Sequence, residues 1–142
     1  MNQIMKKHYP PFNNYKVKNP KDNFIIERIR SIKFSFRGIW FLITTESSIQ
    51  AQLFIAILVS FAGIYFQINS TEWILQTLAI GLVLVAESLN TGIEKLADFI
   101  HPEYHKKIGF IKDVSAGSSG IAAIISLIIA GIIYIPKITL LF

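Results

Sequence analysis

The sequence predicts an all-α membrane protein, with one interfacial amphipathic helix near the N-terminus followed by three transmembrane helices. The chain has 142 residues, of which 52% are hydrophobic and only 16% are charged. Its mean hydropathy is +0.48, and this balance is more apolar than that of a typical soluble domain. Such a composition excludes an intrinsically disordered chain. The absence of cysteine excludes a disulfide scaffold, thiol chemistry and a cysteine-ligated metal site.

Basic residues are segregated along the chain. Of the 14 Lys and Arg residues, nine lie within the first 37 residues, four lie between Lys95 and Lys112, and the last is Lys137. They flank apolar runs without forming a continuous basic surface, so we expect no nucleic-acid binding. Because Lys and Arg concentrate on the cytoplasmic side of membrane proteins, the pattern predicts a multi-pass protein of the inner or cell membrane. Its N-terminus would lie in the cytoplasm and its C-terminus outside.

The N-terminal part divides into a tail and a helix. Residues 1–21 are polar and include two prolines, so we expect a flexible tail there and a single membrane domain over residues 22–142. In residues 22–45, apolar side chains recur at helical spacing beside a basic stripe, a pattern typical of a helix in the membrane interface. An ordinary amphipathic helix on a soluble core is the alternative, but the apolar runs that follow favour the membrane.

Three apolar runs predict spans at about residues 48–68, 73–100 and 114–135. The polar turn of residues 67–72 has no Lys or Arg and is therefore predicted to lie outside. The second run continues with helical periodicity beyond its apolar part, until His101-Pro102 ends it. The loop of residues 103–112 has three lysines and is predicted to be cytoplasmic. We expect Asp113 and Ser115 to cap the third span, which ends before Pro136-Lys137.

Four polar residues on the second span form one stripe: Glu87, Asn90, Glu94 and Asp98. At about 100° per residue they lie within roughly 60° of one another. Counted from Trp73, Glu87 lies near the inner edge of the apolar zone, and the other two carboxylates reach the cytoplasmic interface. Ionisable groups in membrane helices are costly and are therefore functional candidates.

The depth of each carboxylate indicates its chemistry. Carboxylates at the wet end suit Mg²⁺, which prefers oxygen ligands, whereas a deeper, partly desolvated carboxylate suits a general base. Glu46 has the same predicted depth as Glu94 and would complete a metal site with it. Alternatively, these acidic residues mark the membrane boundary or pair with Lys95 or Lys112, and Glu46 is a helix-start carboxylate favoured by the helix dipole.

Two further motifs follow the stripe. Glu103-Tyr104-His105 and Lys112-Asp113 lie in the predicted cytoplasmic loop, where a lysine at the membrane surface can hold phosphate. The small residues of 115–120 are interpreted as a close helix-packing surface.

Together these motifs resemble the signature of the bacterial integral-membrane diacylglycerol kinase and undecaprenol kinase family. The resemblance rests on Glu-x-x-Asn-x-x-x-Glu-x-x-x-Asp at residues 87–98, on Glu-Tyr-His and on Lys-Asp, and it covers about residues 24–137. It implies a homotrimer of three-span protomers that uses ATP and Mg²⁺ to phosphorylate a membrane lipid alcohol. The active site would lie on the cytoplasmic side.

The resemblance also implies individual roles. Glu87 matches the catalytic base, with Asn90 beside it in the active site, and Glu46 and Glu94 match the metal and nucleotide-phosphate ligands. The remaining nucleotide-binding candidates are Asp98, Glu103, Tyr104, His105, Lys112 and Asp113.

Three positions bear on differences within the family. Glu27 and Arg28 stand where one branch has Arg, and Phe34 stands where that branch has Tyr, so the N-terminal nucleotide contacts stay open. Ala116 stands where the diacylglycerol branch has a hydroxyl. Together with Glu72-Trp73-Ile74-Leu75, it favours undecaprenol over diacylglycerol as the acceptor.

Two other function classes are consistent with a small membrane protein: a transporter or channel subunit with an acidic ion path, and a membrane-binding scaffold. A pore requires ionisable groups through the midplane, but residues 74–85 have only Gln76 and Thr77 as polar groups. A scaffold leaves Glu87 without a role. Because a charged stripe facing lipid costs several kcal/mol, we expect a neighbouring protomer to cover it, with Glu46 of one chain facing Glu94 of the next.

Overall fold

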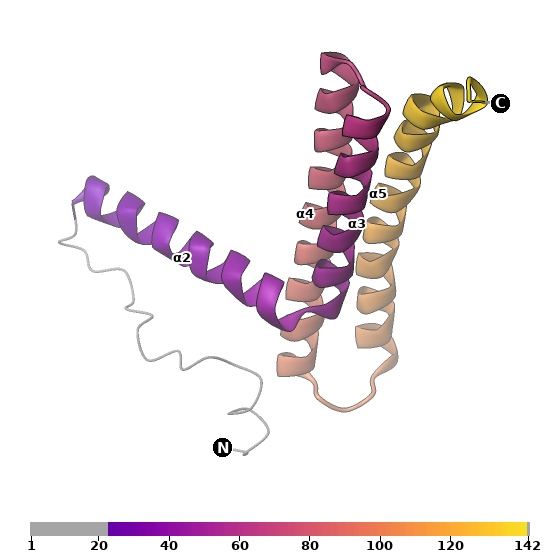
Figure 1. The fold of residues 1–142 in the computed structure, drawn as a ribbon. Helices are drawn as coiled ribbons and strands as arrows, with labels where there is room; N and C mark the ends of the chain where they lie inside the picture. Colours follow the sequence, from indigo (N-terminus) through magenta and orange to yellow (C-terminus); the bar gives the residue numbers. More distant parts are fainter. Residues whose placement is uncertain (1–22, 142) are drawn as a thin grey trace. The chain divides into compact units, whose positions relative to one another are not determined.

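The computed structural model describes residues 23–141, and the predicted N-terminal tail of residues 1–21 lies outside them. The described chain forms four helices, α2 (Phe24–Thr45), α3 (Ser47–Tyr65), α4 (Ser70–Ile100) and α5 (Lys106–Thr139), and residues 23–141 contain no strand (Figure 1). The last three helices are long and apolar enough to cross a membrane. The predicted fold class, an all-α membrane protein with three spans after an amphipathic helix, is confirmed.

The predicted N-terminal helix is present as α2, with no buried residue along its length. The chain divides into two compact units, and the boundary between Ile39 and Trp40 falls inside this helix. In the first unit, the Arg28 guanidinium lies 5.0 Å from the centroid of the Phe24 ring. The interfacial position of α2 and the single domain over residues 22–142 stay predictions.

The three spans pack mainly through α4, which contacts α5 extensively and α3 less. The Tyr134 hydroxyl of α5 lies 3.0 Å from the Val59 carbonyl oxygen of α3 and 2.6 Å from Gln76 Oε1 of α4. The Ser126 hydroxyl of α5 lies 3.1 Å from the Ala79 carbonyl oxygen of α4. These bonds satisfy polar groups that lipid could not.

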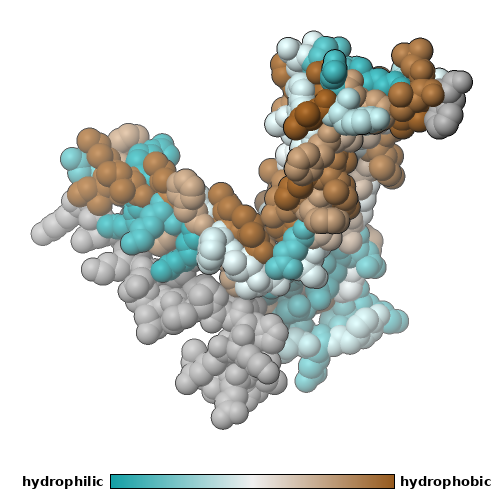
Figure 2. Space-filling model, viewed as in Figure 1, coloured by the Kyte–Doolittle hydropathy of each residue, from teal (hydrophilic) through white to brown (hydrophobic). Residues whose placement is uncertain are grey.

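Large apolar side chains are exposed along all three spans of the single chain. Figure 2 shows the hydrophobic residues gathered along the bundle and the hydrophilic ones toward its two ends. A surface of this kind matches the hydrocarbon layer of a bilayer between two polar boundaries.

The turn between the first two spans lies about three residues earlier than predicted. The first span ends at Tyr65 instead of residue 68, and Gln67 adopts a left-handed backbone conformation with φ 49°. The second begins at Ser70 instead of Trp73, because Asn69 and Glu72 form a capping box. Asn69 Oδ1 accepts from the Glu72 backbone N–H at 3.0 Å, and Glu72 Oε2 accepts from the Asn69 N–H at 2.7 Å. Two otherwise unpaired donors of the first turn are thereby satisfied.

The third span is longer than predicted at both ends. It begins at Lys106 instead of residue 114, because the His105 ring caps it by accepting from the Lys107 backbone N–H at 3.2 Å. Residues 106–112 are therefore helical, and the prediction that Asp113 and Ser115 cap this span is wrong. The helix also continues through Pro136 to Thr139, although proline has no backbone N–H to donate to the carbonyl four residues earlier.

Candidate functional site

The predicted polar stripe lies on one uninterrupted helix, α4. Glu87 and Glu94 are half-buried, Asp98 is exposed, and Asn90 is 7% exposed. Asn90 Nδ2 donates to Glu94 Oε1 at 3.0 Å, whereas Asn90 Oδ1 is buried without a hydrogen-bond partner among the described residues. The structure therefore brings Asn90 and Glu94 together and leaves a buried amide oxygen beside them.

Asp98 and Lys112, two of the predicted nucleotide-binding residues, form an ion pair between α4 and α5. Lys112 Nζ lies 2.6 Å from Asp98 Oδ1, and both side chains are partly exposed. For Asp98, the alternative of pairing with a nearby lysine is therefore what the structure shows. The neighbouring Asp113 is exposed on α5.

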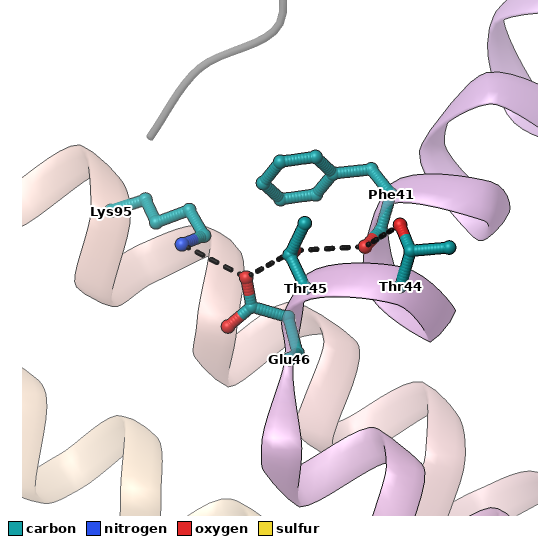
Figure 3. Close-up of polar contacts among 5 residues, drawn as sticks. All are labelled: Phe41, Thr44, Thr45, Glu46 and Lys95. Carbon is teal, nitrogen blue, oxygen red and sulfur yellow. Dashed lines mark hydrogen bonds and ion pairs between the residues drawn. The ribbon is translucent and has the colours of Figure 1, made fainter. Parts of the chain in front are cut away.

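Glu46 occupies the N-cap position of α3, as the helix-start interpretation requires, but its side chain makes no capping bond. Its carboxylate Oε1 lies 3.0 Å from Lys95 Nζ of α4 and 2.9 Å from the Thr45 hydroxyl. Figure 3 shows the carboxylate directed toward α4. Glu46 thus contacts Lys95, the residue after Glu94, within the same chain. The contact between Glu46 of one protomer and Glu94 of the next stays a prediction.

The Glu-Tyr-His motif lies in the connection between α4 and α5, close in sequence to the Asp98–Lys112 pair. Glu103 and Tyr104 are exposed. The His101 and His105 rings lie 5.3 Å apart, and His101 Nδ1 is 2.8 Å from the Glu103 carbonyl oxygen. The motif thus presents exposed side chains on a short connection, with His101 as the C-cap of α4 and His105 as the N-cap of α5.

The remaining candidates lie on α2 and α5. Ala116 is exposed on α5, Arg28 is exposed on α2, and Phe34 is half-buried. Arg28 and Phe34 belong to the first compact unit, whereas Ala116 belongs to the second unit with the stripe.

The carboxylates suit Mg²⁺ only when other ligands complete its shell. The described residues contain no group of three or more His, Asp or Glu side chains placed to hold a metal ion. Mg²⁺, however, is usually bound through one or two carboxylates together with substrate phosphates and water. Glu94 and the unpartnered oxygen of the adjacent Asn90 are the part of such a set that the structure brings together, whereas Glu46 pairs with Lys95. The residues therefore fit a cation that arrives with phosphate.

Sequence reasoning missed several polar groups around the spans. Gln52 Oε1 and Ser119 Oγ are buried without partners among the described residues. Gln52 also lines a cavity of about 390 Å³ between α3, α4 and α5, whose wall is otherwise apolar except at Gln76 and Ser126. A glutamine next to the first apolar run was the available signal.

Known proteins resemble this chain over most of its length. Residues 33–134 match the family described as prokaryotic diacylglycerol kinase. An undecaprenol kinase of Bacillus subtilis (strain 168) is 34% identical over 108 residues, which are 76% of this chain and 88% of that protein. A diacylglycerol kinase of Synechocystis is 25% identical over 107 residues, 75% of this chain and 61% of that protein. One of Escherichia coli (strain K12) is 25% identical over 100 residues, 70% of this chain and 82% of that protein.

These relatives confirm the family resemblance found in the sequence motifs. The matched range begins before Phe34 and includes the whole stripe, the Glu-Tyr-His motif and the Lys-Asp pair. They do not favour the transporter, channel or scaffold alternatives.

Proposed function

The chain belongs to the prokaryotic diacylglycerol kinase family, and on that premise we propose that it transfers the γ-phosphoryl group of ATP to the hydroxyl of a membrane lipid alcohol. Membership makes it an enzyme of the lipid-kinase class. The observation that carries our site assignment is the polar stripe on α4. Buried Asn90 donates a hydrogen bond to Glu94, and Asn90 lies one helical turn from half-buried Glu87.

The nucleotide end of the proposed site lies where the stripe becomes exposed. The Asp98–Lys112 pair and the exposed Glu103 and Tyr104 side chains support phosphate and nucleoside binding there. Glu46 and Glu94 would hold Mg²⁺ together with the nucleotide phosphates. The bound cation would neutralise phosphate charge, which is most of what a phosphoryl-transfer site has to supply.

The acceptor end lies deeper along α4. Glu87 is seven residues from Glu94, about 10 Å along the helix axis, at a depth suited to a lipid hydroxyl. In the proposed step, the hydroxyl oxygen bonds to the γ-phosphorus while the bond from that phosphorus to the β,γ-bridging oxygen breaks. ADP leaves, and the Glu87 carboxylate takes the hydroxyl proton. The apolar cavity, which Leu84 lines one turn away, supports a hydrocarbon chain at this position.

We assign undecaprenol as the acceptor. The undecaprenol kinase of Bacillus subtilis is 34% identical to this chain, whereas two relatives named diacylglycerol kinase are 25% identical. Ala116 also lacks the hydroxyl that the diacylglycerol branch has at this position.

We also propose a homotrimer in the cytoplasmic membrane, with the active site on the cytoplasmic side. Lys106, Lys107 and Lys112 lie at the α4–α5 end, whereas the α3–α4 connection at the other end has no lysine or arginine, which supports this orientation. Asp98 is exposed and Glu87 and Glu94 only half-buried in the single chain, so a neighbouring protomer would shield the stripe from lipid.

The test is phosphate transfer from γ-labelled ATP by the purified protein in lipid nanodiscs. The discs contain undecaprenol, diacylglycerol or neither alcohol. Labelled undecaprenyl phosphate as the main product supports the proposal, and labelled phosphatidic acid in its place would overturn the choice of lipid. Absence of transfer to both alcohols would overturn the function. Glu87→Gln should abolish most transfer, and Glu72→Gln, the same change at the opposite end of α4, is the matched control.

A further inference from the structure

Lys95 forms an ion pair with the proposed metal ligand Glu46 but has no role in the reaction described so far. Lys95 Nζ lies 3.0 Å from Glu46 Oε1, and the exposed fractions of the two side chains are 32% and 18%. The pair links the α2–α3 junction to α4, and its lysine directly follows Glu94 in the sequence.

The ammonium group is held from two directions. Besides the carboxylate, it lies 5.4 Å from the centroid of the Phe41 ring, within the range of a cation–π interaction. Figure 3 shows the Lys95 ammonium group and the Thr45 hydroxyl on opposite sides of the Glu46 carboxylate oxygen, with the Phe41 ring near them. The Lys95 ammonium group is therefore positioned by two contacts, an ion pair and a cation–π interaction.

A lysine ammonium and a divalent cation compete for the same carboxylate. Glu46 Oε1 already accepts from Lys95 and is 2.9 Å from the Thr45 hydroxyl. A divalent cation on this carboxylate would bring two positive groups within a few ångströms of each other, and the pair is too shielded for water to screen that repulsion fully.

We propose that Lys95 is a built-in competitor of the divalent cation at Glu46. This inference rests on the proposed function, because it takes Glu46 as a cation ligand. The lysine makes cation binding weak in the enzyme without nucleotide. A cation that arrives with phosphates carries less net positive charge, so the lysine opposes it less. Lys95 thereby selects the cation–nucleotide complex over the free cation.

The test measures Mn²⁺ binding to the nucleotide-free, full-length protein in nanodiscs, by the loss of the electron paramagnetic resonance signal of free Mn²⁺. Lys95→Met keeps most of the apolar stem and removes the charge, and we expect its Kd for Mn²⁺ to be about two- to five-fold lower than that of the wild type, the range for a partly exposed ion pair. Lys95→Arg should bind Mn²⁺ as the wild type does. Lys107→Met removes an exposed charge from the first turn of α5 and is the matched control.

A second variant protects the test against misfolding. Phe41→Leu leaves the charge of Lys95 in place but removes the ring that holds it, so Mn²⁺ binding should again tighten, by a smaller factor. Unchanged or weaker Mn²⁺ binding in both folded variants would overturn the proposal, since a lysine that only orients Glu46 for the metal predicts weaker binding. Glu46→Gln distinguishes a failure of the proposed metal site from a failure of the role proposed for Lys95. If it leaves Mn²⁺ binding unchanged, the proposed metal assignment itself fails; if it weakens binding, a failure of Lys95→Met concerns Lys95 alone.

Discussion

Tyr134→Phe tests the polar cluster that ties the three spans together. The Tyr134 hydroxyl has one proton and lies near two acceptors, the Val59 carbonyl oxygen at 3.0 Å and Gln76 Oε1 at 2.6 Å. Gln76 is 4% exposed, and its Nε2 reaches the Val59 oxygen only at 3.5 Å. Removing the hydroxyl therefore leaves a buried amide oxygen unpaired, which should lower the free energy of unfolding by about 1–2 kcal/mol.

The assay is reversible unfolding in mixed detergent micelles, followed by circular dichroism. Tyr65→Phe is the matched control, because Tyr65 is 73% exposed at the end of α3 and its variant should keep wild-type stability. Gln76→Leu combined with Tyr134→Phe should recover part of the loss, since both polar partners are then gone. Equal stability of the two Tyr→Phe variants would refute the reasoning. Turnover per folded Tyr134→Phe enzyme should not change, because Tyr134 is not among the residues that line the cavity and its partner Gln76 lies roughly 16 Å along α4 from Glu87.

Three further predictions concern the site and its orientation. Glu87→Gln should lower kcat by roughly 10²–10⁴-fold with little change in ATP binding by equilibrium dialysis; near wild-type transfer would remove Glu87 from the mechanism. Glu94→Gln and Glu46→Gln should each raise the Mg²⁺ concentration needed for half-maximal activity, and either residue loses its metal role if its variant matches the wild type at limiting Mg²⁺. The chain has no cysteine, so Thr71→Cys should react with an impermeant maleimide from outside intact cells and Lys107→Cys only after lysis; the reverse pattern would contradict the orientation.

The sequence predicted the helices and the face that carries the stripe, because both follow from local periodicity. Residues 86–98 keep a helical pattern after the apolar run has ended, and Pro102 disfavours helix at the residue before it. The structure accordingly continues α4 to Ile100 without a break. A continuous helix is enough to align Glu87 with Glu94, so this part of the site required no knowledge of tertiary contacts.

Helix ends were predicted less well, because hydropathy locates the hydrocarbon layer and not the limits of a helix. Residues 106–112 are too polar to count as a span, yet they extend α5 beyond its apolar part. The Asn69–Glu72 capping box was present in the sequence as Asn-x-x-Glu, but a reading based on charge assigned those residues to a loop. The His105 cap offered a weaker signal, since histidine is not among the usual N-cap residues.

Helical periodicity cannot predict which residues of other helices a carboxylate contacts. In the structure, these contacts distinguish the carboxylates from one another. Asp98 pairs with Lys112 and Glu46 pairs with Lys95, whereas Glu87 takes part in no ion pair found among the described residues. A half-buried carboxylate without a counter-ion is costly at membrane depth, so something has to offset that cost. The alternative explanation for the acidic residues of the stripe was that each pairs with a lysine. This explanation accounts for Asp98. It does not account for Glu87. Glu94 is equally half-buried but already accepts a hydrogen bond from Asn90, so we assign the base of the proposed reaction to Glu87.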